Sequence, residues 1–572
     1  MDRPNSPEIQ ISDQLIELAS YWESLGPKRW FQSTAENDTE LTERYGDLYD
    51  YVRNPDNGVT PGTVCSKREW LGYVILFDQI RRHINRLRCT SDGLPTIEFI
   101  QECKTKFEFL NASFDGLTDY EFMFILFPVR HTHHLADMTY VADKTWTRLE
   151  AQSSQAELSP LLRNYLVATY ERYNKLAYDI TENIQVYEPN SGPELPRDST
   201  SALITSLDEF SGLLDPNCGF SGTPRFQICP DMHRQQHIND ETSLVNVVRV
   251  YLAKHPVKDE KCPWNIPLVS LSGGVDSMLC SYILHLLGVE FACVHINYMN
   301  RAECLEEEQF LRYWCTEVIR VPLYVRQICE INRPRCMANG FRDLYESYTH
   351  NVRFDTYVNV GEYIILGHNQ DDTIENTLTN LAACSHYDNL LGMREFMAQT
   401  HRDEPLKLLR PLLQVSKAEI YQFAKQYSIP YLADSTPKWS QRGKIRDIVR
   451  PAIQSWNPQL ITGLTTLSSH LSEMTTLLTT LIGQGREIYT SIDDLPTNQM
   501  YWQILFRNRQ LQVTQRTLAE LVGKIEYLKS RPEKLVINQP MKFTLCKNTM
   551  LKFMRIKTGK IALTLDTSPG AN

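Results

Sequence analysis

The feature that most constrains the fold lies at residues 267–287, where an apolar segment runs into a glycine turn and then into a second apolar segment. Leu268–Leu271 is typical of a buried strand, Gly273 and Gly274 form the turn, and Met278–Leu287 is predicted to be a helix. Adjacent glycines allow consecutive backbone N–H groups to point at one anion, and a helix N-terminus adds roughly half a positive charge. The segment therefore predicts an α/β fold with a phosphate-binding loop.

The charge of this loop limits the type of phosphate chemistry that it can perform. Phosphate loops of the Walker type end in Gly-Lys-Ser/Thr, whereas this turn has no lysine and carries Asp276, flanked by Ser272 and Ser277. A carboxylate repels a polyphosphate unless a divalent cation lies between them. The loop therefore indicates ATP with Mg²⁺ and cleavage that releases pyrophosphate. The alternative is a tight strand-to-helix turn without a ligand.

A second cluster of acids follows another apolar strand. His368, Asp371, Asp372 and Glu375 fall at i, i+3, i+4 and i+7, which predicts that all four share one helical face. Three carboxylates on one face repel one another unless they are solvated or a cation neutralises them. A solvated acidic face is the alternative interpretation. Its place after a buried strand favours a ligand site, because open α/β sheets bind ligands there.

Several motifs in a fixed order carry a family resemblance over Pro267–Pro458. Ser272–Ser277 matches Ser-Gly-Gly-x-Asp-Ser, the signature of the PP-loop ATP pyrophosphatases, and the chain most resembles the tRNA(Ile)-lysidine synthetases among them. Further similar segments are His295–Arg301, Ile364–Leu378, Leu408–Leu413 and Arg442–Pro451. The chain departs from the family pattern at Tyr298, Met299, His350, Asn369, Asn376 and Gly443.

The resemblance implies roles for individual residues. The residues expected to bind ATP are Ser272, Gly273, Gly274, Val275, Asp276, Ser277, His295, Asn297, Arg301, Arg353 and Gly367. Mg²⁺ is expected at Asp276 and Asp372, and the expected catalytic residues are Asp276, His368, Asp371, Asp372 and Glu375. Contacts to RNA are expected from Arg442, Lys444 and Arg446, although the two arginines could instead lie one turn apart on an exposed helix.

The reaction that the resemblance implies is the adenylation of a cytidine in the tRNA anticodon, followed by attack of the lysine side chain and release of AMP. Two other functions remain open. One is a PP-loop enzyme with a different acceptor, such as a base thiolase or an amidating enzyme. The other is a non-catalytic RNA-binding protein on the same fold. The fourteen cysteines include no Cys-x-x-Cys pair, which disfavours thiolation.

Composition limits the partners and the cellular compartment that we expect for the protein. The net charge of −10 is not that of a general nucleic-acid binder, but Lys529–Lys560 holds nine basic residues against the single acid Glu533. Scattered cysteines predict reduced thiols, and the sequence shows no signal peptide and no apolar run of membrane-spanning length. We therefore expect a cytoplasmic protein that makes no membrane contact.

The chain is predicted to have three folded regions. These are a helical domain over 1–186, a PP-loop domain over 241–458 and an α+β RNA-contacting region over 459–572, with a linker and irregular segment at 187–240. Helices are expected within Leu71–Leu87 and Gln155–Ile184. Trp30-Phe31, Leu76–Arg86, Phe127-Pro128 and His131 are similar to a tetratricopeptide-like bacterial family of unknown function. Docking of tRNA or a protein partner is the role expected for this helical domain.

Overall fold

A computed structural model of the 572-residue chain describes most of the sequence. The described residues are 7–30, 34–60, 63–64, 66–90, 96–112, 116–152, 159–178, 183–189, 213, 244–257, 266–383, 393–432, 441–483, 488–489, 491–509, 511, 513–537, 539–546, 549–556 and 560–567. Nearly all of the expected linker, from residue 190 to 240 apart from residue 213, lies outside them.

The chain divides into two compact units, each made from several stretches of sequence. Unit 1 comprises Met1–Glu188, Val294–Arg312 and Leu323–Val360, and unit 2 comprises Pro189–Cys293, Tyr313–Pro322 and Gly361–Asn572. The boundary therefore runs through the PP-loop region and not only at its ends.

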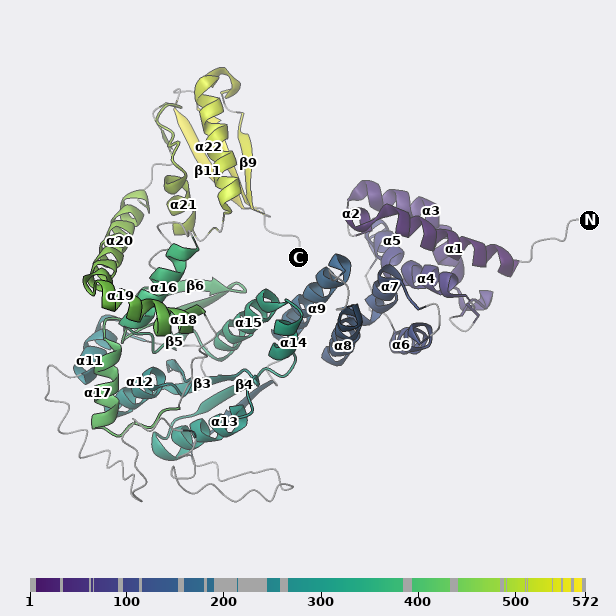
Figure 1. Ribbon diagram of the computed structural model, residues 1–572. Helices are drawn as coiled ribbons and strands as arrows, with labels where there is room; N and C mark the ends of the chain where they lie inside the picture. Colours follow the sequence, from purple (N-terminus) through teal and green to yellow (C-terminus); the bar gives the residue numbers. More distant parts are fainter. Residues whose placement is uncertain are drawn as a thin grey trace, which may run out of the picture. The chain divides into compact units, whose positions relative to one another are not determined.

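The N-terminal part of unit 1 is helical, as the sequence predicts (Figure 1). Its helices are α1 (Pro7–Leu25), α2 (Pro27–Trp30), α3 (Ala35–Arg53), α4 (Lys67–Ile75), α5 (Arg81–Arg88), α6 (Ile97–Asn111), α7 (Asp119–Arg130), α8 (Leu135–Gln152) and α9 (Pro160–Tyr178), with a π-helical turn η2 (Leu76–Ile80) between α4 and α5. Capping boxes begin α4 at Ser66 and α7 at Thr118. Fully buried Trp22, Trp70 and Phe124 form part of the core.

One expected helix ends earlier than its apolar pattern predicts. Within Gln155–Ile184, the helix α9 ends at Tyr178, and Ile184 begins the strand β1 (Ile184–Tyr187). β1 pairs antiparallel with β4 (Leu323–Gln327), a partner that local periodicity does not reveal. The tertiary pairing overrides the local preference here.

Helices α8 and α9 pack against α14 (Arg333–Ala338) and α15 (Arg342–Val360) within unit 1 (Figure 1). Arg335 binds Glu150 through two hydrogen bonds of 2.6 and 2.8 Å. The rings of Trp146 and Phe341 meet edge to face at 5.0 Å. The helical domain is thus joined to part of the PP-loop region by ionic and aromatic contacts.

The main sheet contains seven described strands in the order β1-β4-β3-β2-β5-β7-β6. The strands not yet given are β2 (Leu268–Ser270), β3 (Ala292–Asn297), β5 (Tyr363–Ile365), β6 (Phe396–His401) and β7 (Glu404–Leu409). β5 pairs in parallel with β2 and with β7, whereas β1 and β6 are antiparallel edge strands. The central strands are buried, as expected of a parallel sheet covered by helices. The predicted α/β class is confirmed.

The helices that precede and cover the strands complete the PP-loop region. They are α11 (Leu244–Lys254), α12 (Val275–Leu286), α13 (Cys304–Tyr313), η6 (Trp314–Val318), α16 (Gln370–Ala382), α17 (Lys417–Gln426), α18 (Gln441–Lys444), η7 (Ile445–Val449) and α19 (Arg450–Trp456). A capping box formed by Ser416 and Glu419 begins α17.

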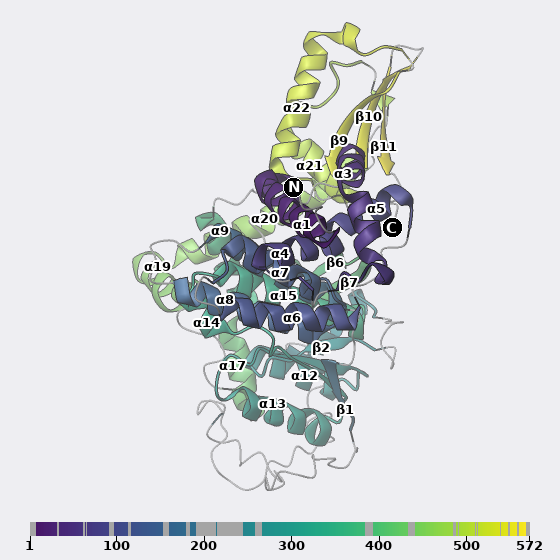
Figure 2. The same ribbon diagram turned by 90° about the vertical axis from the view of Figure 1, so that its right-hand side faces the viewer.

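The C-terminal region is α+β, as predicted. Its helices are α20 (Gln459–Gly483), α21 (Gln499–Asn508) and α22 (Gln515–Ser530), and its sheet has the order β8-β11-β10-β9. These strands are β8 (Ile488–Tyr489), β9 (Met541–Cys546), β10 (Thr549–Arg555) and β11 (Ile561–Thr567). Figure 2 shows α22 lying along this sheet, and buried Trp502, Ile525 and Phe553 belong to the core between them.

Candidate functional site

The glycine loop joins β2 to α12 and leaves the first turn of that helix without a side-chain cap. Gly273 has φ +80°, a conformation that favours glycine, and Gly274 is the N-cap in extended conformation. The helix begins at Val275, not at Met278 as predicted, so Asp276 lies in its first turn. Uncapped N–H groups and the positive end of the helix dipole form a ready anion site.

Hydroxyl groups hold the loop in this shape. Ser277 Oγ donates to the carbonyl oxygen of Gly274 at 3.0 Å and accepts from the backbone N–H of Ser272 at 3.1 Å. Ser272 Oγ lies 3.2 Å from Ser277 Oγ. The two serines therefore fix the loop from inside.

Gly367 lets a second loop approach the first. A Cβ atom added at Gly367 would lie 2.8 Å from the carbonyl carbon of Asp276 and 2.9 Å from the backbone nitrogen of Ser277. Both are backbone atoms, which cannot move aside cheaply. Only glycine fits at this close approach.

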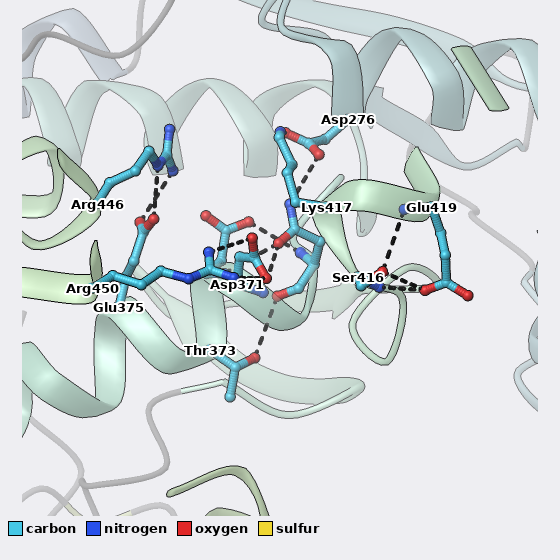
Figure 3. A network of polar contacts seen from close by, with 11 residues as sticks. Asp276, Asp371, Thr373, Glu375, Ser416, Lys417, Glu419, Arg446 and Arg450 are labelled. Carbon is cyan, nitrogen blue, oxygen red and sulfur yellow. Dashed lines mark hydrogen bonds and ion pairs between the residues drawn. The ribbon is translucent and has the colours of Figure 1, made fainter. Parts of the chain in front are cut away.

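The Asp276 carboxylate is held by a lysine from a distant helix (Figure 3). Lys417 Nζ lies 2.5 Å from Oδ2, and Asn369 Nδ2 donates to Oδ1 at 2.9 Å. Burial raises the pKa of Asp276 above its usual value, although Lys417 opposes that effect, and the nearby negative charge of Asp372 adds to it. The Asp276 side chain keeps 23% of its exposure, so it is still reachable from solvent.

Asn369 shapes the start of α16. Its Oδ1 accepts hydrogen bonds from the backbone N–H groups of Asp371 and Asp372 at 2.9 and 3.2 Å, and Asp372 Oδ2 accepts from the backbone N–H of Asn369 at 3.0 Å. This reciprocal capping box places His368 before the helix. The prediction of one helical face for all four residues is wrong for His368, because the cap ends the helical periodicity.

Two of the carboxylates on α16 pair with arginines from the same unit (Figure 3). Asp371 is bound by Arg450 of α19 at 2.5 and 3.1 Å. Glu375, which is fully buried, is bound by Arg446 of η7 at 2.8 and 3.1 Å. Burial acts to lower the pKa of Arg446, but these bonds to Glu375 raise it above its usual value. These two carboxylates are thus neutralised by arginines of the protein itself.

His368 lies beside a buried arginine. Arg410 Nε donates to His368 Nδ1 at 2.9 Å, and Arg410 Nη1 donates to the carbonyl oxygen of Arg394 at 2.8 Å. Since Nδ1 accepts this bond, neutral His368 carries its proton on Nε2. Burial lowers the pKa of Arg410 below its usual value.

Four of the predicted ATP-binding residues belong to unit 1. His295 and Asn297 lie in buried β3, and the Asn297 amide donates to Glu308 at 2.7 Å. Arg301 binds Glu307 at 2.7 Å. Arg353 is half-buried in α15, where a bond to Tyr298 helps to raise its pKa against the effect of burial.

The residues predicted to contact RNA fall on α18 and η7. Arg442 lies in α18, but its side chain is outside the described part of the structure. Lys444 is exposed. Arg446 does not project freely from an exposed helix, because it is paired with Glu375.

Four residues that complete the site were not predicted as site residues: Asn369, Lys417, Arg410 and Arg450. Ser416–Glu419 was recognisable as a capping box, which puts Lys417 in the first turn of α17. Its meeting with Asp276, 141 residues away, depends on tertiary structure.

Comparison with known families agrees with this geometry. The model of the PP-loop domain matches residues 251–454. The chain contains a PP-loop domain. Residues 18–200 match the model of a bacterial protein of unknown function, DUF924, so the N-terminal resemblance is confirmed as well.

Individual relatives are similar over the same region. The tRNA(Ile)-lysidine synthase of Bacteroides thetaiotaomicron is 28% identical over 228 residues, which are 38% of this chain and 50% of that protein. The enzyme of the same name from Chlamydia muridarum is 29% identical over 194 residues, 33% of this chain and 57% of that protein. The chain spans about half the length of these curated relatives.

Among solved structures, the U34-tRNA thiolase NcsA from Methanococcus maripaludis, with its [4Fe-4S] cluster, matches with a TM-score of 0.32 and 15% identity. The match covers 40% of this chain and 78% of that chain.

Two features are absent from the described residues. None of their helices is long and apolar enough to cross a membrane. Nor do they contain a group of three or more His, Cys, Asp or Glu side chains able to hold a metal ion.

Proposed function

We propose that this protein is an ATP-dependent tRNA-modifying enzyme that adenylates a base and then joins an amine to it. The observation that carries this proposal is the uncapped N-terminus of α12 with Asp276 in its first turn, within a matched PP-loop domain. The N–H groups of the loop and of α12 would bind the ATP phosphates. They would also stabilise the negative charge that develops on pyrophosphate as it leaves.

Asp276 and Asp372 would be the protein ligands of Mg²⁺ in this arrangement. The two carboxylates are near enough for the charge of Asp372 to raise the pKa of Asp276, so a cation would relieve their repulsion. Mg²⁺ is commonly bound by one or two carboxylates together with phosphate oxygens and water. When bound, it would neutralise negative charge on the phosphates.

In the structure the positive charge beside Asp276 comes from Lys417. Its ammonium group bonds to Asp276 at 2.5 Å. In the proposed ATP complex Lys417 moves from the carboxylate to a phosphate oxygen. A lysine from α17 thus supplies the positive charge that a Walker loop carries in its own sequence.

The proposed chemistry has two steps. In the first, the ring carbonyl oxygen of a cytidine forms a bond to the α-phosphorus of ATP while the bond to the β-phosphate oxygen breaks and pyrophosphate leaves. In the second, the ε-amino group of lysine forms a bond to the ring carbon, the carbon–oxygen bond to AMP breaks, and the nitrogen loses a proton. The named relatives, tRNA(Ile)-lysidine synthases, support lysine as the amine and tRNA as the acceptor.

The acidic residues of α16 are proposed to receive the cationic amine. Asp371 is paired with Arg450, so binding of an ammonium group there requires exchange of one cation for another. Glu375 or His368 would take the proton, and each must first lose part of its bond to Arg446 or Arg410. The arginines therefore occupy these side chains until a cationic substrate competes with them.

A PP-loop enzyme with a different acceptor is the second candidate. The same loop and acidic helix would serve it, and only the step after adenylation would differ. The test is an assay of the full chain with ATP, Mg²⁺, labelled lysine and bulk tRNA. Label entering RNA in wild type but not in Asp276→Asn supports lysidine formation. ATP–pyrophosphate exchange without lysine incorporation favours another acceptor, and the absence of ATP turnover with any RNA excludes the enzymatic function.

A further inference from the structure

The helical domain of unit 1 buries a charged network that the proposed ATP chemistry does not use. Asp78, in η2, is fully buried. His131 Nδ1 donates to its two carboxylate oxygens at 2.9 and 3.0 Å, and Arg82 donates to Asp78 Oδ1 at 3.0 Å. Although burial opposes its ionisation, His131 and Arg82 hold the pKa of Asp78 below its usual value. Burial lowers the pKa of His131 to about 4, so His131 is neutral near pH 7.

Two further arginines gather at this network. The Arg130 guanidinium lies over the rings of Phe127 and Tyr165, 4.9 and 5.0 Å from their centroids. Arg172 Nη2 donates to the carbonyl oxygens of His131 and Thr132 at 3.0 and 3.5 Å. Burial lowers the pKa of Arg172, and the positive charges of Arg130 and Arg82 lower it further. The three guanidinium groups are thus close enough to repel one another.

Among the described residues, the charged side chains that act most strongly on one another here are three arginines and two acids. Arg82, Arg130 and Arg172 face one buried acid, Asp78, and one acid on the exposed surface of α9, Glu171. Neutral His131 adds no charge. An excess of half-buried positive charge is costly unless an anion compensates it.

The same cluster contains donors with no acceptor. Within the described residues, the Nε atoms of Arg130 and Arg172 and the Tyr165 hydroxyl are buried and have no hydrogen-bond partner. Tyr165 is 3% exposed. Capping of the α7 C-terminus accounts for Arg172 Nη2, but it leaves these three donors unexplained.

We propose that Arg82, Arg130, Arg172 and Tyr165 bind the phosphate group of a small ligand. Guanidinium forks match the oxygens of phosphate, and a phosphate group has enough acceptor oxygens for all four side chains while its negative charge offsets the excess positive charge. A carboxylate has only two oxygens, so it offers fewer acceptors to this donor set. The site lies in the matched DUF924 region and goes beyond the proposed ATP chemistry.

Tyr165→Phe is the sharpest test, because it keeps the ring and removes only a hydroxyl that has no hydrogen-bond partner among the described residues. The full chain is titrated with inorganic phosphate by calorimetry at constant ionic strength, in a Lys417→Gln background that weakens phosphate binding at the PP-loop. We expect Tyr165→Phe to lower phosphate affinity about fivefold and Arg130→Gln about tenfold or more. The melting temperature without phosphate should not fall in Tyr165→Phe.

Arg44→Gln serves as the matched control, because Arg44 is a surface arginine paired with Glu17. It should leave phosphate affinity unchanged. The proposal is overturned if phosphate does not bind, if it binds equally well in Tyr165→Phe and Arg130→Gln, or if acetate binds more tightly than phosphate. Should Arg130→Gln fail to fold, Tyr165→Phe alone decides.

Discussion

At the residue scale, Asp276 combines two opposing influences. A carboxylate in the first turn of a helix is ordinarily stabilised by the helix dipole, yet burial raises the pKa of this one. The side chain is thus held in a position that costs stability in its charged form. Such a cost is expected where a carboxylate serves a cation or a substrate.

This cost has a predictable pH dependence. Because the folded pKa of Asp276 is raised, the folded protein binds that proton more tightly than the unfolded chain, and the resulting stabilisation is lost as pH rises through the raised pKa. The free energy of unfolding of wild type, minus that of Asp276→Asn, should therefore fall as pH rises from about 4. Urea unfolding of both proteins over a pH series measures it. A difference that stays constant or grows with pH would contradict a raised pKa of Asp276 in the folded protein.

Gly367 provides a second test at this scale. Gly367→Ala places a Cβ atom within 3 Å of the Asp276 backbone, so we expect a loss of about 1–3 kcal/mol in unfolding free energy and a strong loss of ATP turnover. Gly523→Ala, in α22, is the matched control, since its added Cβ would meet nothing within 4 Å. That control should be neutral or stabilise by up to ~1 kcal/mol. Equal behaviour of the two variants would show that the close approach is unimportant.

At the element scale, ion pairs connect α16 to the segments η7 and α19. Arg446 is the partner of fully buried Glu375, so Arg446→Met leaves a buried carboxylate without its cation. We expect a loss of about 3 kcal/mol in unfolding free energy and a smaller loss when Glu375→Leu is added. Arg516→Gln, which breaks an exposed pair with Glu520, should cost under about 1 kcal/mol. A double variant as unstable as Arg446→Met would argue against this coupling.

The contact of α8 and α9 with α14 and α15 is a further feature of this scale. Phe341 is 3% exposed and packs on Trp146, whereas Phe109 in α6 is 73% exposed. We expect Phe341→Ala to lower the unfolding free energy by about 3–5 kcal/mol and Phe109→Ala to have little effect. Hydrogen exchange should be faster in α9 of the Phe341 variant, because the helices belong to one unit. Unchanged exchange in α9 would mean that the two parts fold independently.

At the scale of the whole molecule, sequence reasoning was most successful where the signal is local. The strand, the glycine turn and the following helix are contiguous, so their order and their anion-binding geometry were predictable. The start of α12 was missed because the residue preceding it, Gly274, acts as an N-cap without a side chain. The prediction that His368 lies on the helical face of α16 was wrong, because Asn369 caps the helix after His368.

The rest of the site depends on contacts between residues far apart in the sequence. Neither Lys417 nor Arg450 stands in a pattern that points to its carboxylate partner. The sequence predicts an acidic cluster that is either solvated or neutralised by cations, but the partners are known only from the fold, which brings Arg446 to Glu375 and Arg450 to Asp371. Charge complementarity was thus predictable, whereas the partners were not.

We propose that the PP-loop of this protein activates a tRNA base with ATP for attack by lysine. The most direct measurement follows α-labelled ATP and labelled lysine together in the presence of bulk tRNA. We expect that one AMP forms for each lysine joined to RNA, that AMP formation requires tRNA, and that both products disappear in Asp276→Asn. AMP formation that is independent of tRNA, or equal in Asp276→Asn and wild type, would contradict it.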